Sequence, residues 1–369
     1  MSLEATGELD AHLSSGPFGS AEFLEENCNV LYEELARLLS DRLGFGIPNP
    51  MSVSDLATKI VLRRDLEFAF AELAEGKPVS CVEALRRSSS LRTEPGAGFR
   101  HALIHGLTFF SDYSQDGFAD DVRRTFMKSM KGEGARVFGV RPSREQLETA
   151  RSALEWARLI LPSTLSGTLS LASAVVLVRG EISSAYINEN PFSFFVNATQ
   201  FADMPLLVET LFHEALHEKM ARIRLTSNLL HATYEDLDSE ANGDVLVPWP
   251  AAKKPRHWSF ARALAAFHVY VHTSAFYQQI LSEPSASESC GICSKTLTDR
   301  SVVQFERARY LHAALCDDRC LSFADLDGTD FLAWTGKVLD RIEPEIFENA
   351  RPERRPFSWD LSTIRRAAA

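Results

Sequence analysis

The sequence predicts an α+β protein that is predominantly α-helical and contains a small antiparallel sheet. Along most of the chain, apolar residues recur at three- and four-residue spacing, which is typical of amphipathic helices. Residues 170–199 differ, because they hold three short segments rich in β-branched and aromatic side chains, with turn residues between them. These segments come directly before another helical stretch, so the predicted sheet precedes that helix in the chain.

The composition excludes several classes of protein. Of the 369 residues, 45% are hydrophobic and 24% are charged, as is usual for globular proteins and unlike disordered or fibrous ones. The net charge of −11 argues against a protein that mainly holds nucleic acid, because phosphate contacts need an excess of Lys and Arg. No segment approaches the roughly 20 apolar residues that cross a bilayer, and the first residues lack the features of a signal peptide. We therefore expect a cytoplasmic protein with no membrane partner.

Four regions are expected along the chain. Residues 1–19 are polar and rich in Gly and Ser, so we expect a disordered tail there. Residues 20–160 are predicted to be a helical N-terminal region, residues 161–345 a metal-binding catalytic region, and residues 346–369 a basic C-terminal tail. Helices are expected over residues 23–39, 54–73, 79–88, 99–110, 143–161, 205–230, 257–280, 302–315 and 329–342.

Two details of the N-terminal region can be checked directly. Ser143 followed by Gln146 is a capping box, which marks the start of the helix that runs to Leu161. His101 and His105 lie four residues apart in the expected helix over 99–110, with no acidic residue between them. We interpret these two histidines as core or surface residues and not as a metal site.

The most specific signal in the sequence is the motif HEALH at residues 213–217, inside a predicted helix. Residues four apart lie on one face of a helix, so His213 and His217 can bind one metal ion. Glu214 then lies beside the metal and can act on a bound water molecule. Apolar residues around the motif indicate a buried site of low dielectric constant.

A third metal ligand has to come from further along the chain. Glu235 and Glu240 are possible by spacing, but they lie in an acidic segment that is more typical of a solvated loop. His268 and His272 lie four residues apart on a strongly apolar predicted helix. Although a buried histidine is usually a core residue, a second pair is harder to explain in that way. We therefore predict His268 as the third ligand, with His272 as the next candidate.

Three segments together resemble a family of peptide-modification proteins that carry an H-E-x-x-H motif. The segments are residues 211–217, the sequence Val-Pro-Trp-Pro at 247–250, and residues 262–270 around His268. The resemblance covers about residues 160 to 285, and it implies an iron(II)- and 2-oxoglutarate-dependent enzyme that hydroxylates the β-carbon of a residue in a ribosomally synthesised precursor peptide. It also implies that His213, His217 and His268 hold the iron. Arg262 or Arg256 would then bind the distal carboxylate of 2-oxoglutarate.

Two other functions remain open from the residues alone. One is a zinc metallopeptidase, in which Glu214 takes a proton from a zinc-bound water and Glu240 is the third ligand. The other is a non-catalytic peptide-binding protein. The sequence leaves the choice of iron or zinc undecided.

Four cysteines suggest a separate structural zinc site. Cys290 and Cys293 form a C-x-x-C pair in a predicted loop, and Cys316 and Cys320 form a second pair, with 22 residues between the two pairs. Four thiolates can bind zinc tetrahedrally, although the second pair is one residue wider than usual. The alternative is four ordinary reduced cysteines.

Overall fold

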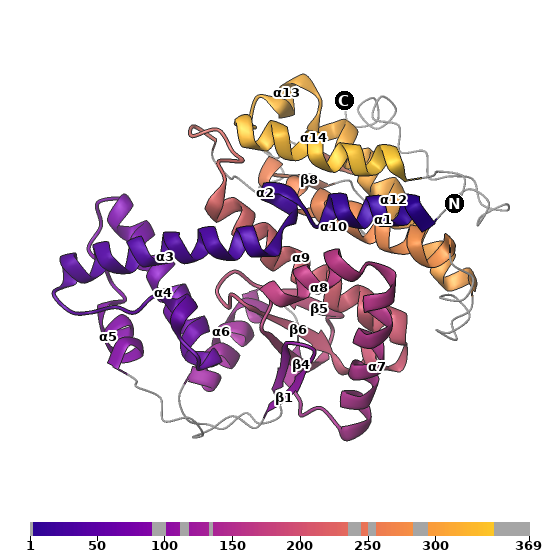
Figure 1. Ribbon diagram of the computed structural model, residues 1–369. Helices are drawn as coiled ribbons and strands as arrows, with labels where there is room; N and C mark the ends of the chain where they lie inside the picture. The colour runs from indigo at the N-terminus through magenta and orange to yellow at the C-terminus, as the bar shows by residue number, and fades with distance from the viewer. Residues whose placement is uncertain are drawn as a thin grey trace. The chain divides into compact units, whose positions relative to one another are not determined.

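The computed structural model describes residues 3–90, 101–110, 118–132, 136–234, 245–249, 256–282 and 294–342. In these ranges the protein is about 68% helical, with 13 α-helices, two short 3₁₀-helices, one small mixed sheet and a two-stranded hairpin (Figure 1). The prediction of a mostly helical α+β protein is therefore confirmed. In the same part of the chain, no helix is long and apolar enough to cross a membrane.

The chain divides into two compact units. Unit 1 consists of Met1–Gly19, Leu159–Thr164 and Ile223–Ala369, and unit 2 consists of Ser20–Arg158 and Leu165–Arg222. This division differs from the predicted boundary at residue 160, since each unit takes segments from both sides of it. Contacts between segments that are distant in sequence define the units, and a linear reading of composition cannot detect such contacts.

Unit 2 contains the sheet and the helices around it. The capping box is confirmed, because the Ser143 backbone N–H donates to Gln146 Oε1 at 2.8 Å and the Gln146 N–H donates to Ser143 Oγ at 3.1 Å. The helices are α3 (Ala21–Leu43), η1 (Pro50–Ser52), α4 (Leu56–Ala74), α5 (Val82–Ser90), α6 (Phe118–Gly132), α7 (Arg144–Ile160), α8 (Pro162–Leu171), η2 (Ala198–Ala202) and α9 (Met204–Thr226). Of these, α7, α8 and α9 each begin in one unit and end in the other.

The sheet is mixed, which corrects the prediction of an antiparallel one. Its strand order is β1-β2-β4-β6-β5, and β3 pairs with β4. The β2–β4 and β4–β6 pairs are parallel, and the other pairs are antiparallel. The chain reaches β5 at the edge first and then returns as β6 between β5 and β4, so β6 runs parallel to β4. The strands are β1 (His101–Ile104), β2 (Leu107–Phe110), β3 (Val137–Gly139), β4 (Ala174–Gly180), β5 (Ser184–Tyr186) and β6 (Ser193–Asn197).

The helix expected over residues 99–110 is a hairpin of β1 and β2. His105 and Gly106 connect the two strands with φ angles of 49° and 89°. These left-handed conformations break a helix, and glycine adopts them without a steric penalty. Pairing of β2 with β4 then fixes the extended conformation. Tertiary pairing thus overrides the local apolar spacing.

One face of the sheet packs against α4 and α6. Phe195 of β6 and Phe126 of α6 stack with their ring centroids 3.5 Å apart. Side chains alternate between the faces of a strand, so Phe194 and Val196 point to the other face. Figure 1 shows α6 on one side of the sheet and α7 on the other. The core on the α4–α6 side consists of Ile60, Val61, Phe110, Val122, Phe126, Met130, Val137, Ala174, Val176, Val178, Ile187, Phe192 and Phe195.

Unit 1 is a group of helices with a short hairpin. Helix α10 contacts α12 and α14, and α1 contacts α10 and α14. The hairpin strands β7 and β8 pair antiparallel. The elements are α1 (Leu3–Leu13), α2 (Gly16–Gly19), β7 (Val245–Val247), β8 (Arg256–Trp258), α10 (Phe260–Ser282), α12 (Ser294–Leu315), α13 (Asp318–Leu321) and α14 (Leu326–Arg341).

The expected disordered tail over residues 1–19 instead forms α1 and α2. Leu9 and Leu13 are buried, and the Asp10 carboxylate accepts hydrogen bonds from the backbone N–H groups of Ser163 and Thr164 at 3.0 and 2.8 Å. Asp10 therefore satisfies free N–H groups at the start of α8. Composition alone could not reveal this partner, which lies about 150 residues away. The basic tail over residues 346–369 lies outside the described residues.

Candidate metal site

The HEALH motif lies within α9, and its two histidines converge. His213 Nε2 and His217 Nε2 are 3.3 Å apart. Two nitrogens at this separation, each about 2.1 Å from one ion, subtend an angle of about 104° at that ion. This angle lies between the tetrahedral and octahedral values. The pair therefore fits two adjacent positions in the coordination sphere of zinc or iron.

Burial keeps His217 in the form that binds metal. Desolvation, followed by the effect of His213, lowers the pKa of His217 to about 3. The imidazole is therefore neutral at physiological pH, and a neutral ring nitrogen can donate its lone pair to a metal.

Glu214 is held against the edge strand β5. Its Oε1 atom accepts a 2.6 Å hydrogen bond from Ser184 Oγ, and its carboxylate also accepts one from the backbone N–H of Tyr186. Burial raises the pKa of Glu214 to about 7, although these two hydrogen bonds oppose the rise. A carboxyl group with such a pKa exchanges protons near neutral pH, as a general acid or base requires.

Tyr186 contacts the same helix one turn further on. Its hydroxyl donates a 3.0 Å hydrogen bond to Glu218 Oε2, and its ring stacks on the His217 ring at 6.1 Å between centroids and 17° between planes. Burial and the negative charge of Glu218 raise the pKa of Tyr186 well above its usual value. The phenol therefore stays protonated and remains a donor.

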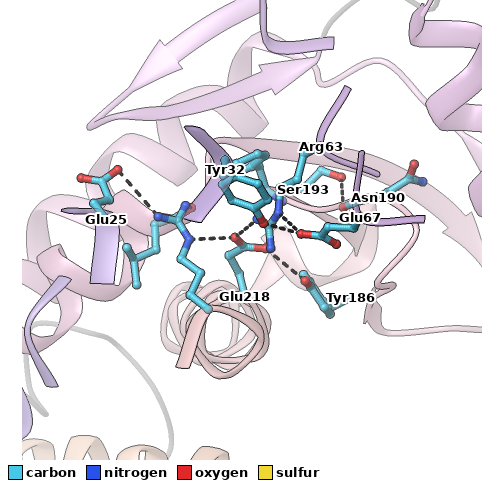
Figure 2. A network of polar contacts seen from close by, with 11 residues as sticks. Glu25, Tyr32, Arg63, Glu67, Tyr186, Asn190, Ser193 and Glu218 are labelled. Atoms are coloured by element: carbon cyan, nitrogen blue, oxygen red, sulfur yellow. Dashed lines mark hydrogen bonds and ion pairs between the residues drawn. The ribbon is translucent and has the colours of Figure 1, made fainter. Parts of the chain in front are cut away.

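Glu218 is the centre of a buried network of charges (Figure 2). Its Oε1 atom accepts from Arg63 at 2.6 Å and from Arg222 Nε at 2.9 Å, while Oε2 accepts from the Phe192 backbone N–H at 3.0 Å. Burial would raise the pKa of Glu218, but the two arginines and these hydrogen bonds hold it below its usual value. The carboxylate is therefore charged and joins α4, α9 and the segment before β6.

The network continues toward α3. Arg63 Nε donates to Glu67 Oε1 at 2.9 Å, and the hydroxyl of Tyr32 also donates to that oxygen. Arg222 lies 3.8 Å from Glu25. Figure 2 shows Tyr32, Arg63, Glu67 and Tyr186 gathered around Glu218.

Sequence reasoning missed this network. A partial signal existed, since Glu218 and Arg222 lie four residues apart on a helix with many apolar residues. Arg63 could not be found in this way, because 155 residues separate it from Glu218.

The predicted third ligand His268 belongs to α10 of unit 1. It is fully buried, and its ring lies 4.3 Å from that of His272 and 5.7 Å from that of Phe331. Among the described residues, no group of three His, Cys, Asp or Glu side chains is placed to hold a metal. Glu235 and Glu240 lie outside those residues. The third ligand therefore stays a prediction.

The predicted arginines also belong to unit 1. Arg262 lies in the first turn of α10, and its guanidinium group is 4.9 Å from the centre of the Trp258 ring. The backbone of Arg256 pairs with Val247 in the β7–β8 hairpin. A role for either residue in binding 2-oxoglutarate stays a prediction. In unit 2, Arg63 and Arg222 both bind Glu218.

The structure describes half of the cysteines predicted to bind a structural zinc. Cys316 is exposed and Cys320 is buried. Cys290 and Cys293 lie outside the described residues, so the zinc site stays a prediction. His105 lies in the turn between β1 and β2, and its Nε2 atom is 3.6 Å from the carboxylate of Glu155 in α7.

A scan of the chain against models of known protein families finds no match. No curated protein matches its sequence either.

Proposed function

We propose that this chain is a metal-dependent enzyme that modifies a peptide, with His213 and His217 as two of the metal ligands. The observation that carries the proposal is the 3.3 Å separation of the two Nε2 atoms. Two imidazole nitrogens at this distance, with a carboxyl group held by β5 beside them, match the arrangement of metal ligands and an outer partner in metalloenzymes.

We infer that the reaction is iron(II)/2-oxoglutarate-dependent hydroxylation of a β-carbon in a precursor peptide. The three segments that resemble the peptide-modification family support this choice. The oxidant would be O₂: with iron(II) held at this site, one oxygen atom would go to the β-carbon as a hydroxyl group, and the other would go to the succinate that forms when 2-oxoglutarate loses CO₂. His213 and His217 would hold the metal with His268, and Arg262 or Arg256 would bind the distal carboxylate, to which the planar guanidinium group is matched.

The peptide is the proposed partner because of the strand next to Glu214. In the described sheet, β5 is the terminal strand and pairs with β6. An edge strand can add an extended peptide through main-chain hydrogen bonds. A substrate bound in this way would lie beside Ser184 and Tyr186, close to Glu214. We also propose that the enzyme and its peptide meet in the cytoplasm.

The second candidate is a zinc metallopeptidase, and the environment of Glu214 favours it. A buried carboxyl group whose pKa is about 7 suits a general base at neutral pH. In this case the carboxylate would accept a proton from the attacking water, and Ser184 would hold the carboxylate in place. Glu240 would be the third ligand.

Anaerobic metal analysis, followed by addition of 2-oxoglutarate and O₂, distinguishes these functions. Hydroxylation predicts retained iron and succinate release, with loss of both in His213→Ala and His268→Ala. His105→Ala is the control, because its ring lies in the hairpin beside Glu155. Bound iron without succinate release in the presence of candidate peptides would contradict the hydroxylase.

A Glu214→Gln variant tests the peptidase. Peptide cleavage that zinc supports and that this variant lacks would establish hydrolysis. If the wild type and the Glu214→Gln variant both bind peptide, and if neither needs a metal to do so, the non-catalytic interpretation would be established instead.

A further inference from the structure

We propose that Tyr186 is a positioning residue, which fixes the His217 ring and the Glu214 carboxylate by tying β5 to α9 through Glu218. This inference rests on the proposed function, since it assigns the metal to the histidine pair. It adds a residue that lies outside the HEALH motif and outside the three segments that carry the resemblance.

The geometry of the two elements matches. Ser184 and Tyr186 are two residues apart in β5, so their side chains share one face and are separated by roughly 6.6 Å along the strand. Glu214 and Glu218 are four residues apart in α9, or about 6 Å along the helix. Two parallel contacts therefore form, one from Ser184 to Glu214 and one from Tyr186 to Glu218.

Tyr186 contributes to both contacts. Its hydroxyl donates to Glu218, while its backbone N–H donates to Glu214. Its ring also stacks on His217. The side chain and backbone of one residue thus reach a proposed ligand, the candidate acid–base group and the buried ion network.

Glu218 is a rigid anchor for this arrangement. Arg63 and Arg222 both bind its Oε1 atom, and the Phe192 N–H binds the same Oε2 atom as Tyr186. The side chains of Glu218, Arg63 and Arg222 are 0%, 2% and 1% exposed. Because this anchor is fully enclosed, loss of the Tyr186 hydroxyl frees the ring while the ion pairs stay in place.

The chain offers a matched control in Tyr32. The hydroxyl of Tyr32 donates to Glu67 in the same network, but no contact links Tyr32 to the histidine pair among the interactions described for unit 2. Tyr32→Phe and Tyr186→Phe therefore each remove one phenolic oxygen bonded to a glutamate. Only Tyr186→Phe is expected to alter the metal site.

The test uses the full chain, stripped of metal and then titrated with Co²⁺ or with Zn²⁺ against a chromogenic chelator. We expect Tyr186→Phe to weaken metal binding by about tenfold or more, as loss of an outer partner commonly does. The visible absorption of bound Co²⁺ should change as well. Tyr32→Phe should retain the affinity and spectrum of the wild type, and thermal unfolding of all variants reports their stability.

Ser184→Ala gives a second variant, which breaks the neighbouring contact without touching the ion pairs. It should also change the Co²⁺ spectrum. Equal weakening in Tyr186→Phe and Tyr32→Phe, or wild-type affinity and spectrum in both Tyr186→Phe and Ser184→Ala, would overturn the inference.

His213→Ala separates this inference from the proposed function. If His213→Ala abolishes binding but Tyr186→Phe and Ser184→Ala bind as the wild type does, only the role of Tyr186 is wrong. If His213→Ala binds metal as tightly as the wild type, the proposed function is wrong, and this inference is wrong with it.

Discussion

Ser184 Oγ donates a 2.6 Å hydrogen bond to Glu214 Oε1, so the edge strand β5 contacts the HEALH helix at its acidic residue. We expect Ser184→Ala to lower turnover by about tenfold, because Glu214 loses one of the two donors that orient it. Steady-state kinetics with the peptide that the wild type modifies measure the effect. Ser183→Ala, at the exposed preceding residue, is the control and should keep wild-type turnover.

The Glu218 ion network should be essential for stability. Glu218→Ala leaves the buried Arg63 and Arg222 side chains without their shared carboxylate, and breaking a buried ion pair costs about 3–5 kcal/mol. Urea unfolding measures this loss. Glu34→Ala, which breaks an ion pair with Arg37 whose partners are more than half exposed, should cost less than about 1 kcal/mol. Similar losses in the two variants would contradict the prediction.

Lys219 makes the stability of the metal-free protein depend on pH. Burial lowers its pKa from 10.5 to about 7, and its side chain is almost inaccessible. Between these pH values the unfolded chain binds more protons than the folded one, so the free energy of unfolding rises with pH. Lys219→Met removes the free-energy cost of burying the lysine amine, which must lose its proton or be buried with its charge. The variant should be more stable than the wild type at pH 7, with an advantage that shrinks toward pH 10.

Urea unfolding at several pH values tests this prediction. Lys128→Met replaces an exposed lysine of α6 and serves as the control. A stability difference between Lys219→Met and the wild type that is constant from pH 7 to pH 10 would show that burial of the charge is not its cause.

The stacked pair of Phe126 and Phe195 should hold α6 on the sheet. Both rings are at most 2% exposed, and their centroids are 3.5 Å apart. We expect Phe195→Ala to cost about 3–5 kcal/mol, since it removes a large buried side chain and leaves a cavity. Phe138→Ala, at a ring 66% exposed in β3, should stay within about 0.5 kcal/mol of the wild type. Calorimetry or urea unfolding measures both.

The sequence by itself determined the features that depend on helix geometry. The spacing of HEALH places His213 and His217 on one face, and the structure brings their Nε2 atoms to 3.3 Å. The capping box at Ser143 and Gln146 was also predicted, because its hydrogen bonds join residues three positions apart. Such contacts are local, so the order of residues is sufficient to find them.

Only the tertiary structure decided the contacts between distant segments. The hairpin of β1 and β2 forms where apolar spacing predicted a helix, because pairing with β4 outweighs a weak local preference. Arg63 reaches Glu218 across 155 residues, and Asp10 reaches Thr164 across 154. The energy of these contacts is gained only after the chain has folded, when burial strengthens a charge pair that water would otherwise screen.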